Sequence, residues 1–142
     1  MSPLTLERLA FLDGQAAYHR VAVDEAGAVA AFLLAFREGS AYDSPNYRWF
    51  AEHYERFLYV DRVVVSATHQ GRGVGPRFYA DLFAFAGQAR AMRVTCEFDI
   101  DPPNEVSRRF HERHGFREVG SQAVAGGTKR VSLQAVALEE IG

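Results

Sequence analysis

The first half of the chain alternates between two hydrophobic periods. Residues 4–12 place apolar side chains at helical spacing, which predicts a short helix before the hairpin that follows. Residues 18–24 alternate and residues 29–36 are almost continuously apolar, and the Ala26-Gly27 pair between them is typical of a turn. We therefore expect a short helix and then a β-hairpin.

The next segments are a loop and an aromatic helix. Residues 39–46 are rich in Gly, Ser, Asp, Pro and Asn, which predicts a loop. Residues 47–54 carry several aromatic side chains and predict a short helix packed near that loop.

The second half of the chain alternates strands and helices. Residues 57–65 are dense in β-branched and aromatic residues and predict a strand. A glycine-rich loop leads into a predicted helix over 76–89, whose Pro76 suits the first helical position. The later predicted elements are a strand at 93–99, a helix at 105–114 ending at Gly115, and strands at 116–124 and 130–138 around Gly126-Gly127. This order predicts one mixed α/β domain over residues 1–142.

Composition narrows the class of protein. The chain has 142 residues, of which 48% are apolar and 24% charged, as expected for a soluble domain that buries a core. A net charge of −2 argues against a nucleic-acid partner, and no apolar run predicts a membrane span. Cys96 is the single cysteine, and the N-terminus shows no signal peptide, so we expect a cytoplasmic protein without disulfides or a zinc site.

The glycine-rich loop carries the clearest chemistry. Its residues run Gln70-Gly71-Arg72-Gly73-Val74-Gly75, and backbone N–H groups at the start of a helix form a pocket for anions. A P-loop is excluded because no Lys lies nearby, and a dinucleotide fingerprint is disfavoured by Pro76 and by the mid-chain position of the loop. The structural alternative is a tight strand-to-helix turn that binds no ligand.

Two segments together resemble the GNAT superfamily of acetyl-CoA-dependent N-acetyltransferases. Residues 63–75 are similar to its acetyl-CoA motif, and Asn104, Ser107 and residues 110–116 are similar to its second motif. The resemblance implies a bent mixed central sheet flanked by helices, with acetyl-CoA held at splayed strands. It also implies direct transfer of the acetyl group to a primary amine in a ternary complex.

The resemblance assigns the cofactor site residue by residue. Main-chain groups of Val63 and Val65 would pair with the pantetheine arm, and the loop amides would hold the pyrophosphate. Asn104 would hydrogen-bond the cofactor, although it could equally be the N-cap of the following helix. The implied set is Val63, Val65, Gln70, Gly71, Arg72, Gly73, Val74, Gly75 and Asn104.

The catalytic candidates include one departure from the family pattern. The family usually has Tyr, as an acid that protonates the departing thiolate, where this chain has His111. An imidazole could serve as that acid; the alternatives are solvent as the acid and a histidine with no chemical role. Asp61 and Glu97 are the candidate bases for the attacking amine, unless they only pair with Arg62 or Arg93.

The acceptor side is predicted from the loop and the aromatic helix. We expect Tyr42, Asp43 and Tyr47 to bind the amine, whereas Trp49 and Phe50 equally fit a helix packed on the sheet. The acceptor itself stays open among a peptide N-terminus, lysine, a polyamine, an amino acid and an aminoglycoside. A covalent role for Cys96 is disfavoured because the family transfers directly, and no metal is expected.

The short front of the chain is the second departure. About sixteen residues precede Ala17, so we expect one helix and no counterpart of the family's first strand. Such a domain could be completed by a second copy, which predicts a homodimer. The rival hypothesis is a non-catalytic acyl-CoA-binding or regulatory domain. A pure scaffold is disfavoured because the glycine loop is intact.

Overall fold

The computed structural model describes residues 17–23, 26–27, 29–65, 73–101 and 105–138, and a mixed sheet lies at its centre. Its strands are β1 (Tyr18–Val23), β2 (Val29–Arg37), β3 (Leu58–Val65), β4 (Arg93–Asp101), β5 (Arg117–Val124) and β6 (Lys129–Ala137). Its helices are α2 (Pro45–His53), α3 (Val74–Gln88) and α4 (Glu105–Arg113), and η2 (Ala125–Gly127) is a 3-10 turn between β5 and β6. The predicted α/β class is confirmed.

The sheet consists of two antiparallel units joined by one parallel pair. The strand order is β1-β2-β3-β4-β6-β5, and β3 and β4 are the parallel neighbours. The predicted hairpin is the β1–β2 pair, in which Tyr18 lies opposite Ala35. A parallel pair needs a crossover connection, and α3 provides it between β3 and β4.

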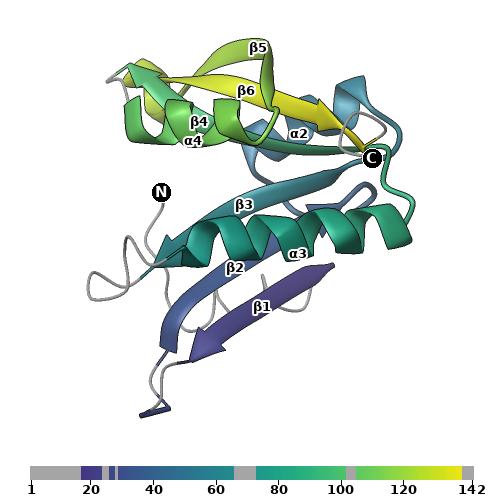
Figure 1. Cartoon of the computed structure of the whole chain (residues 1–142). Helices are drawn as coiled ribbons and strands as arrows, with labels where there is room; N and C mark the ends of the chain where they lie inside the picture. The colour runs from purple at the N-terminus through teal and green to yellow at the C-terminus, as the bar shows by residue number, and fades with distance from the viewer. Residues whose placement is uncertain (1–16, 24–25, 28, 66–72, 102–104, 139–142) are drawn as a thin grey trace.

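The two faces of the sheet carry two separate hydrophobic cores. Helices α3 and α4 cover one face and α2 covers the other (Figure 1). Consecutive residues of β2 serve opposite cores, since Leu33 packs with Leu82 of α3 and Leu34 packs with Phe50 of α2. A strand buried on both faces has an almost continuous apolar sequence, which explains the pattern of residues 29–36.

The parallel strands β3 and β4 separate soon after they meet. Their register pairs Leu58 with Val94 and Tyr59 with Thr95, and within the described parts of both strands no later pair follows. Figure 1 shows the two strands diverging from there, with α3 on one side. The main chain of β3 beyond Tyr59 therefore faces β4 without a strand partner there.

The helix boundaries differ from the predictions at two N-termini. Helix α2 begins at Pro45, two residues early, because the Ser44 side chain accepts a hydrogen bond from the Tyr47 N–H and caps it. Helix α3 begins at Val74, so Pro76 lies third rather than first. Gly73 allows this early start because it adopts φ 77° at the N-cap, a left-handed conformation that glycine tolerates best.

The C-terminus of α4 agrees with the prediction. Phe116 N–H donates to His111 C=O and Gly115 N–H donates to Glu112 C=O, the hydrogen-bond pattern of a Schellman motif. The predicted helix over residues 4–12 and the expected loss of a first strand lie outside the described residues and stay predictions. None of the helices in the described ranges has the length and apolar character needed to cross a bilayer.

Helix α2 packs closely on β5 at Gly120. A Cβ added to Gly120 would lie 2.5 Å from Cζ2 of Trp49, so the ring would have to move. We expect Gly120→Ala to lower the free energy of unfolding by about 1–3 kcal/mol, measured by thermal or denaturant unfolding. The matched control is Gly87→Ala on the exposed side of α3, where a Cβ meets nothing within 4 Å. The control should raise stability by up to about 1 kcal/mol, and equal losses in both variants would contradict the close packing.

Candidate active site

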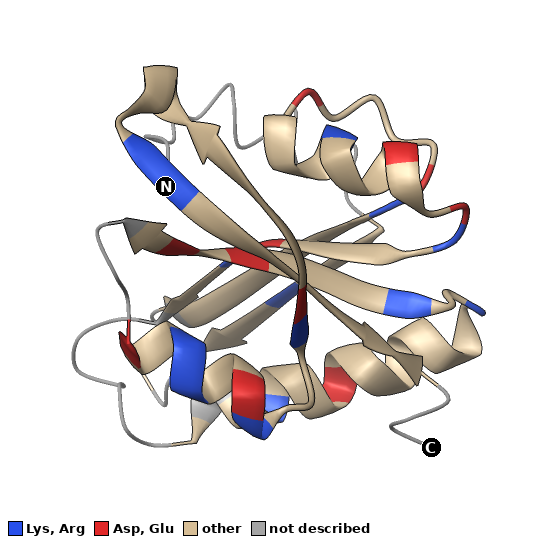
Figure 2. Ribbon diagram, turned by 90° about the horizontal axis from the view of Figure 1, so that it is seen from above, with Lys and Arg blue, Asp and Glu red and all other residues tan. Residues whose placement is uncertain are grey.

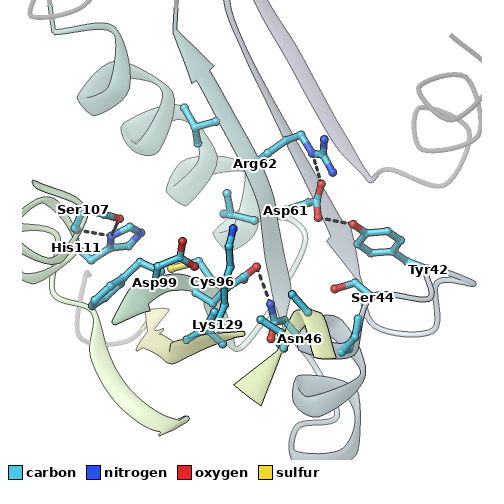
Figure 3. Close-up of a pocket in the computed structure, with 18 of the residues that line it drawn as sticks. Tyr42, Ser44, Asn46, Asp61, Arg62, Cys96, Asp99, Ser107, His111 and Lys129 are labelled. Carbon is cyan, nitrogen blue, oxygen red and sulfur yellow. Dashed lines mark hydrogen bonds and ion pairs between the residues drawn. The ribbon is translucent and has the colours of Figure 1, made fainter. Parts of the chain in front are cut away.

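A cavity of about 800 Å³ opens where β3 and β4 separate. Its walls come from β3, β4, α3, α4, β6 and the loop before α2, so it reaches both faces of the sheet (Figure 3). Acidic positions lie on the central strands as well as on the outer helices (Figure 2). The charged residues of the lining are Asp43, Asp61, Arg62, Glu97, Asp99 and Lys129. This excess of carboxylates favours a cationic ligand such as an ammonium ion.

Glu97 of β4 is held by hydrogen bonds from two other elements. The Tyr59 hydroxyl of β3 lies 2.8 Å from each carboxylate oxygen, and Asn46 Nδ2 of α2 donates to Oε1 at 3.0 Å. Asn46 is fixed in turn by Gln122 of β5, whose Nε2 donates to Asn46 Oδ1 at 2.7 Å. The carboxylate therefore has a fixed position at the cavity wall.

The environment of Glu97 places its titration near neutrality. Burial raises the pKa of Glu97 from 4.5 to about 7, because desolvation disfavours the charged form. The nearby Asp61 and Asp99 carboxylates act in the same direction, while the hydrogen bonds from Tyr59 and Asn46 limit the rise. A carboxyl group with this pKa can accept a proton and release it again close to neutral pH.

Asp61 lies at a β-bulge. Leu34 and Ala35 of β2 pair with Arg62 and Val60 of β3, so the intervening Asp61 has no partner on β2. A bulge brings two successive side chains to one side of the strand. Arg62 Nε accordingly donates to Asp61 Oδ2 at 2.5 Å, and the Tyr42 hydroxyl donates to the other oxygen.

The ion pair between Asp61 and Arg62 is the structural alternative to a catalytic role that the sequence analysis gave for Asp61. Arg62 is only 7% exposed, and its Nη1 has no hydrogen-bond partner among the residues that the structure describes. Arg93, the other candidate partner, instead stacks on the Tyr54 ring at 4.1 Å. Glu97 is thus the cavity carboxylate held by neutral donors, which makes it the stronger candidate base.

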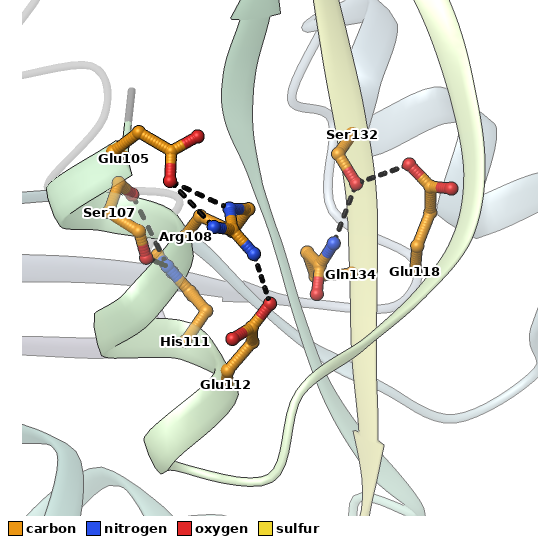
Figure 4. A network of polar contacts seen from close by, with 8 residues as sticks. All are labelled: Glu105, Ser107, Arg108, His111, Glu112, Glu118, Ser132 and Gln134. Carbon is orange, nitrogen blue, oxygen red and sulfur yellow. Dashed lines mark hydrogen bonds and ion pairs between the residues drawn. The ribbon is translucent and has the colours of Figure 1, made fainter. Parts of the chain in front are cut away.

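His111 of α4 lies on the opposite side of the cavity from Tyr42 (Figure 3). It is 7% exposed and stacks on Phe98, and burial lowers its pKa. Its Nδ1 lies 2.6 Å from the Ser107 carbonyl oxygen, which can only accept, so Nδ1 carries the proton (Figure 4). Nε2 of the neutral ring then presents a lone pair. Arg108 pairs with Glu105 and Glu112 on exposed parts of the same helix.

The cofactor residues implied by the sequence are described in part. Gln70, Gly71, Arg72 and Asn104 lie outside the described residues. Val63 lines the cavity, and the backbone of Val65 ends β3. Gly73 is the N-cap of α3, and Val74 and Gly75 form its first turn, where backbone N–H groups have no intrahelical acceptor.

The acceptor residues divide between the cavity and the core. Tyr42 and Asp43 line the cavity, and the Tyr42 ring stacks on Phe36 at 4.3 Å. Tyr47 is 2% exposed inside the second core, and its hydroxyl donates to the Arg37 carbonyl oxygen, so the structure places it away from the cavity wall. Phe50 is fully buried there too. The sequence pattern could not separate these aromatic residues because all lie in one short segment.

The remaining chemistry considered for the cavity is a cysteine nucleophile and a metal site. Cys96 lines it, but burial raises the pKa of the thiol well above its usual range and opposes a nucleophilic role. Within the described part of the chain, no group of three or more metal-ligating side chains occurs. The sequence analysis did not identify Asn46 and Tyr59, which bind Glu97 from other elements, or Lys129, which lines the cavity, because no motif marks these positions.

Comparisons with known proteins agree with this geometry. The sequence pattern of the acetyltransferase (GNAT) family matches residues 2–116. A phosphinothricin N-acetyltransferase of Streptomyces coelicolor is 39% identical over 64 residues, which cover 45% of this chain and 36% of that protein.

Solved structures show the same fold at low sequence identity. Nourseothricin acetyltransferase aligns with a TM-score of 0.66 and 21% identity, over 84% of this chain and 64% of its own. Ard1 from Thermoplasma volcanium aligns with a TM-score of 0.75 and 14% identity, and the alignment covers 96% of this chain and 81% of that chain.

The environment of Glu97 predicts an unusual titration. We expect one glutamate carboxyl to titrate near pH 7 in NMR spectra of protein labelled at its glutamate carboxyls. That resonance should be missing from Glu97→Gln. A wild-type spectrum in which every glutamate titrates in the usual acidic range would contradict the assignment.

The same shift makes stability depend on pH. The unfolded chain releases this proton near pH 4.5 and the folded chain near pH 7, so the folded state binds more protons between the two values. The free energy of unfolding should therefore fall by roughly 3 kcal/mol, relative to Glu97→Gln, as pH rises through this window. Denaturant titrations of both proteins measure the difference, and parallel curves would refute it.

Proposed function

Because the chain belongs to the acetyltransferase (GNAT) family, we propose that it transfers the acetyl group of acetyl-CoA to a primary amine. The observation that carries this proposal is Glu97, a carboxyl with a pKa of about 7 in a cavity between separating strands. The phosphinothricin N-acetyltransferase relative supports an amine acceptor, although the chain covers 36% of its length.

The acyl donor would lie along the free side of β3. Beyond Tyr59, the described main chain of β3 has no strand partner toward β4, and buried backbone groups need partners. Main-chain groups of Val63 and Val65 would pair with the pantetheine arm. The N–H groups at the start of α3, with Gln70, Gly71, Arg72, Gly73, Val74 and Gly75, would hold the pyrophosphate, and Asn104 would add a hydrogen bond.

The acceptor would enter from the side of Tyr42 and Asp43. An alkyl amine is protonated at neutral pH and cannot attack until it loses a proton. In our proposal Glu97 accepts that proton, directly or through water, and Asp61 contributes negative charge beside it. The neutral nitrogen then forms a bond to the thioester carbon as the carbon–sulfur bond breaks, in one ternary complex, and the second proton of the nitrogen is lost to solvent.

His111 has a modified role in this proposal. The family position calls for a proton donor, but Nδ1 of His111 is committed to Ser107 and Nε2 presents a lone pair. As a neutral imidazole in the cavity wall, His111 accepts a hydrogen bond from the acyl donor or from water. Only its imidazolium form, which burial disfavours, could act as the acid.

Gly73 offers a test of the cofactor site with a matched pair of variants. Asn and Asp have nearly the same shape and both tolerate left-handed backbone, so Gly73→Asn and Gly73→Asp differ mainly in charge. A carboxylate there would repel the pyrophosphate, and we expect Gly73→Asp to bind acetyl-CoA at least about tenfold more weakly than Gly73→Asn. Calorimetric titration with acetyl-CoA, CoA and ATP measures this. Equal affinities of the two variants would show that the assignment is wrong.

Turnover separates the proposed enzyme from a non-catalytic acyl-CoA-binding domain. We expect thiol release from acetyl-CoA with at least one amine of a panel, and a loss of about 10²- to 10⁴-fold in Glu97→Gln. Acetyl-CoA affinity should be unchanged in that variant. The control is Glu112→Gln, a change on the exposed part of α4. Acetyl-CoA binding without turnover of any amine would favour the binding domain instead.

A further inference from the structure

Tyr79 is a buried tyrosine of α3 that the sequence motifs do not mark. It lines the cavity together with Cys96 and His111 and is 3% exposed. It lies six positions after Gly73, which places it about 9 Å along the helix axis from the N-cap of α3. It therefore lies deeper in the cavity than the proposed pyrophosphate site.

The ring of Tyr79 is fixed by its neighbours. It meets Phe110 edge-to-face at a centroid distance of 5.0 Å and Phe116 at 6.1 Å. The His111 ring lies 6.3 Å away, also edge-to-face. This packing between α3 and α4 gives the hydroxyl a defined position without any hydrogen bond of its own.

The Tyr79 hydroxyl differs from those of the other buried tyrosines. The hydroxyls of Tyr18, Tyr42, Tyr47 and Tyr59 each donate to an oxygen, respectively of Asp81, Asp61, Arg37 and Glu97. The Tyr79 hydroxyl has no hydrogen bond to any residue in the described ranges. Its oxygen is not among the buried side-chain atoms that lack a partner in the described ranges, Arg62 Nη1 and Thr95 Oγ1, so it is open to the cavity and can donate to a group bound there.

The proposed reaction needs a hydrogen-bond donor at the leaving sulfur, and the neutral His111 ring does not present one to the cavity. When the carbon–sulfur bond breaks, the electron pair stays on sulfur, and a hydrogen-bond donor stabilises the charge that develops. His111 stands at the family position for this role, but its Nε2 presents a lone pair. Tyr79 lies next to His111 and has a hydroxyl free to donate.

We propose that the Tyr79 hydroxyl donates a hydrogen bond to the thioester sulfur and to the thiolate that leaves. This inference rests on the proposed function. The amine proton passes to Glu97, the carbon–nitrogen bond forms and the carbon–sulfur bond breaks, and Tyr79 keeps its own proton. The thiolate is then protonated through solvent by the proton that Glu97 releases.

The electrostatics of Tyr79 suit a donor that is not consumed. Burial, with Cys96 and Glu97 nearby, raises the pKa of Tyr79 well above its usual range. The hydroxyl therefore keeps its proton while it stabilises a neighbouring anion. This differs from the full proton transfer expected of a general acid at the family position.

The test measures the thiol of bound CoA and does not depend on turnover. The ultraviolet absorbance of the thiolate gives the pKa of the CoA thiol in complexes with wild type, Tyr79→Phe and Tyr18→Phe. We expect the pKa in Tyr79→Phe to be about one unit or more above that in wild type, because a hydrogen bond to a charged group is lost. Tyr18→Phe should match wild type, since Tyr18 binds Asp81 instead of lining the cavity.

Turnover and stability give two further readouts. For Tyr79→Phe, kcat should fall about 10- to 100-fold, with KM for acetyl-CoA changed by less than about twofold. Its melting temperature should not fall, because the variant removes an unpaired hydroxyl, whereas Tyr18→Phe should melt lower.

Each outcome bears on a different claim. Unchanged thiol pKa and unchanged kcat in a folded Tyr79→Phe would overturn the role of Tyr79 and leave the proposed function standing. If wild type binds neither CoA nor acetyl-CoA, the proposed function fails and the role of Tyr79 fails with it.

Discussion

The early separation of β3 and β4 is the constraint on which the site depends. Two parallel pairs, at Leu58 and Tyr59, hold the halves of the sheet together before the strands diverge. Had pairing continued, β3 would have used its main-chain groups on β4, and no cavity could pass between the two faces. The separation is tolerated because each half is antiparallel and because both cores contain residues from both halves. One departure from regular pairing thus creates both a binding edge and an opening.

The chemistry of the cavity follows from how its carboxylates are satisfied. Asp61 is bound by a guanidinium, whereas Glu97 is bound by a phenol and an amide. Burial without a cationic partner raises the pKa of Glu97 to about 7. The supporting donors come from β3 and α2, and Gln122 of β5 holds Asn46. The pKa of one side chain consequently depends on elements from both halves of the sheet.

Much of the fold was predictable from the sequence, because burial pattern and turn chemistry are local. The apolar run of β2, the turn at Gly27 and the end of α4 at Gly115 were all readable this way. The starts of α2 and α3 were not, since the Ser44 cap and the left-handed Gly73 depend on backbone geometry. The site was predictable only where motifs or carboxylates marked it. Tyr47 and Tyr79 are both helical tyrosines, and nothing in their sequence context distinguishes them. Tyr47 nevertheless belongs to the core, whereas Tyr79 lines the cavity.

The position of Tyr79 shows why one motif residue is a weak test of activity. Helices α3 and α4 cover the same face of the sheet, and their aromatic side chains interlock around Tyr79. A hydrogen-bond donor on either helix could reach a sulfur atom that lies between α3 and α4. The sulfur requires a donor at a given position, whichever helix supplies it. His111 in place of tyrosine then changes the helix that supplies the donor. The reacting atoms require particular groups at particular positions in the cavity, whichever residues supply those groups. Function is therefore better inferred from the arrangement of the whole cavity than from one motif residue.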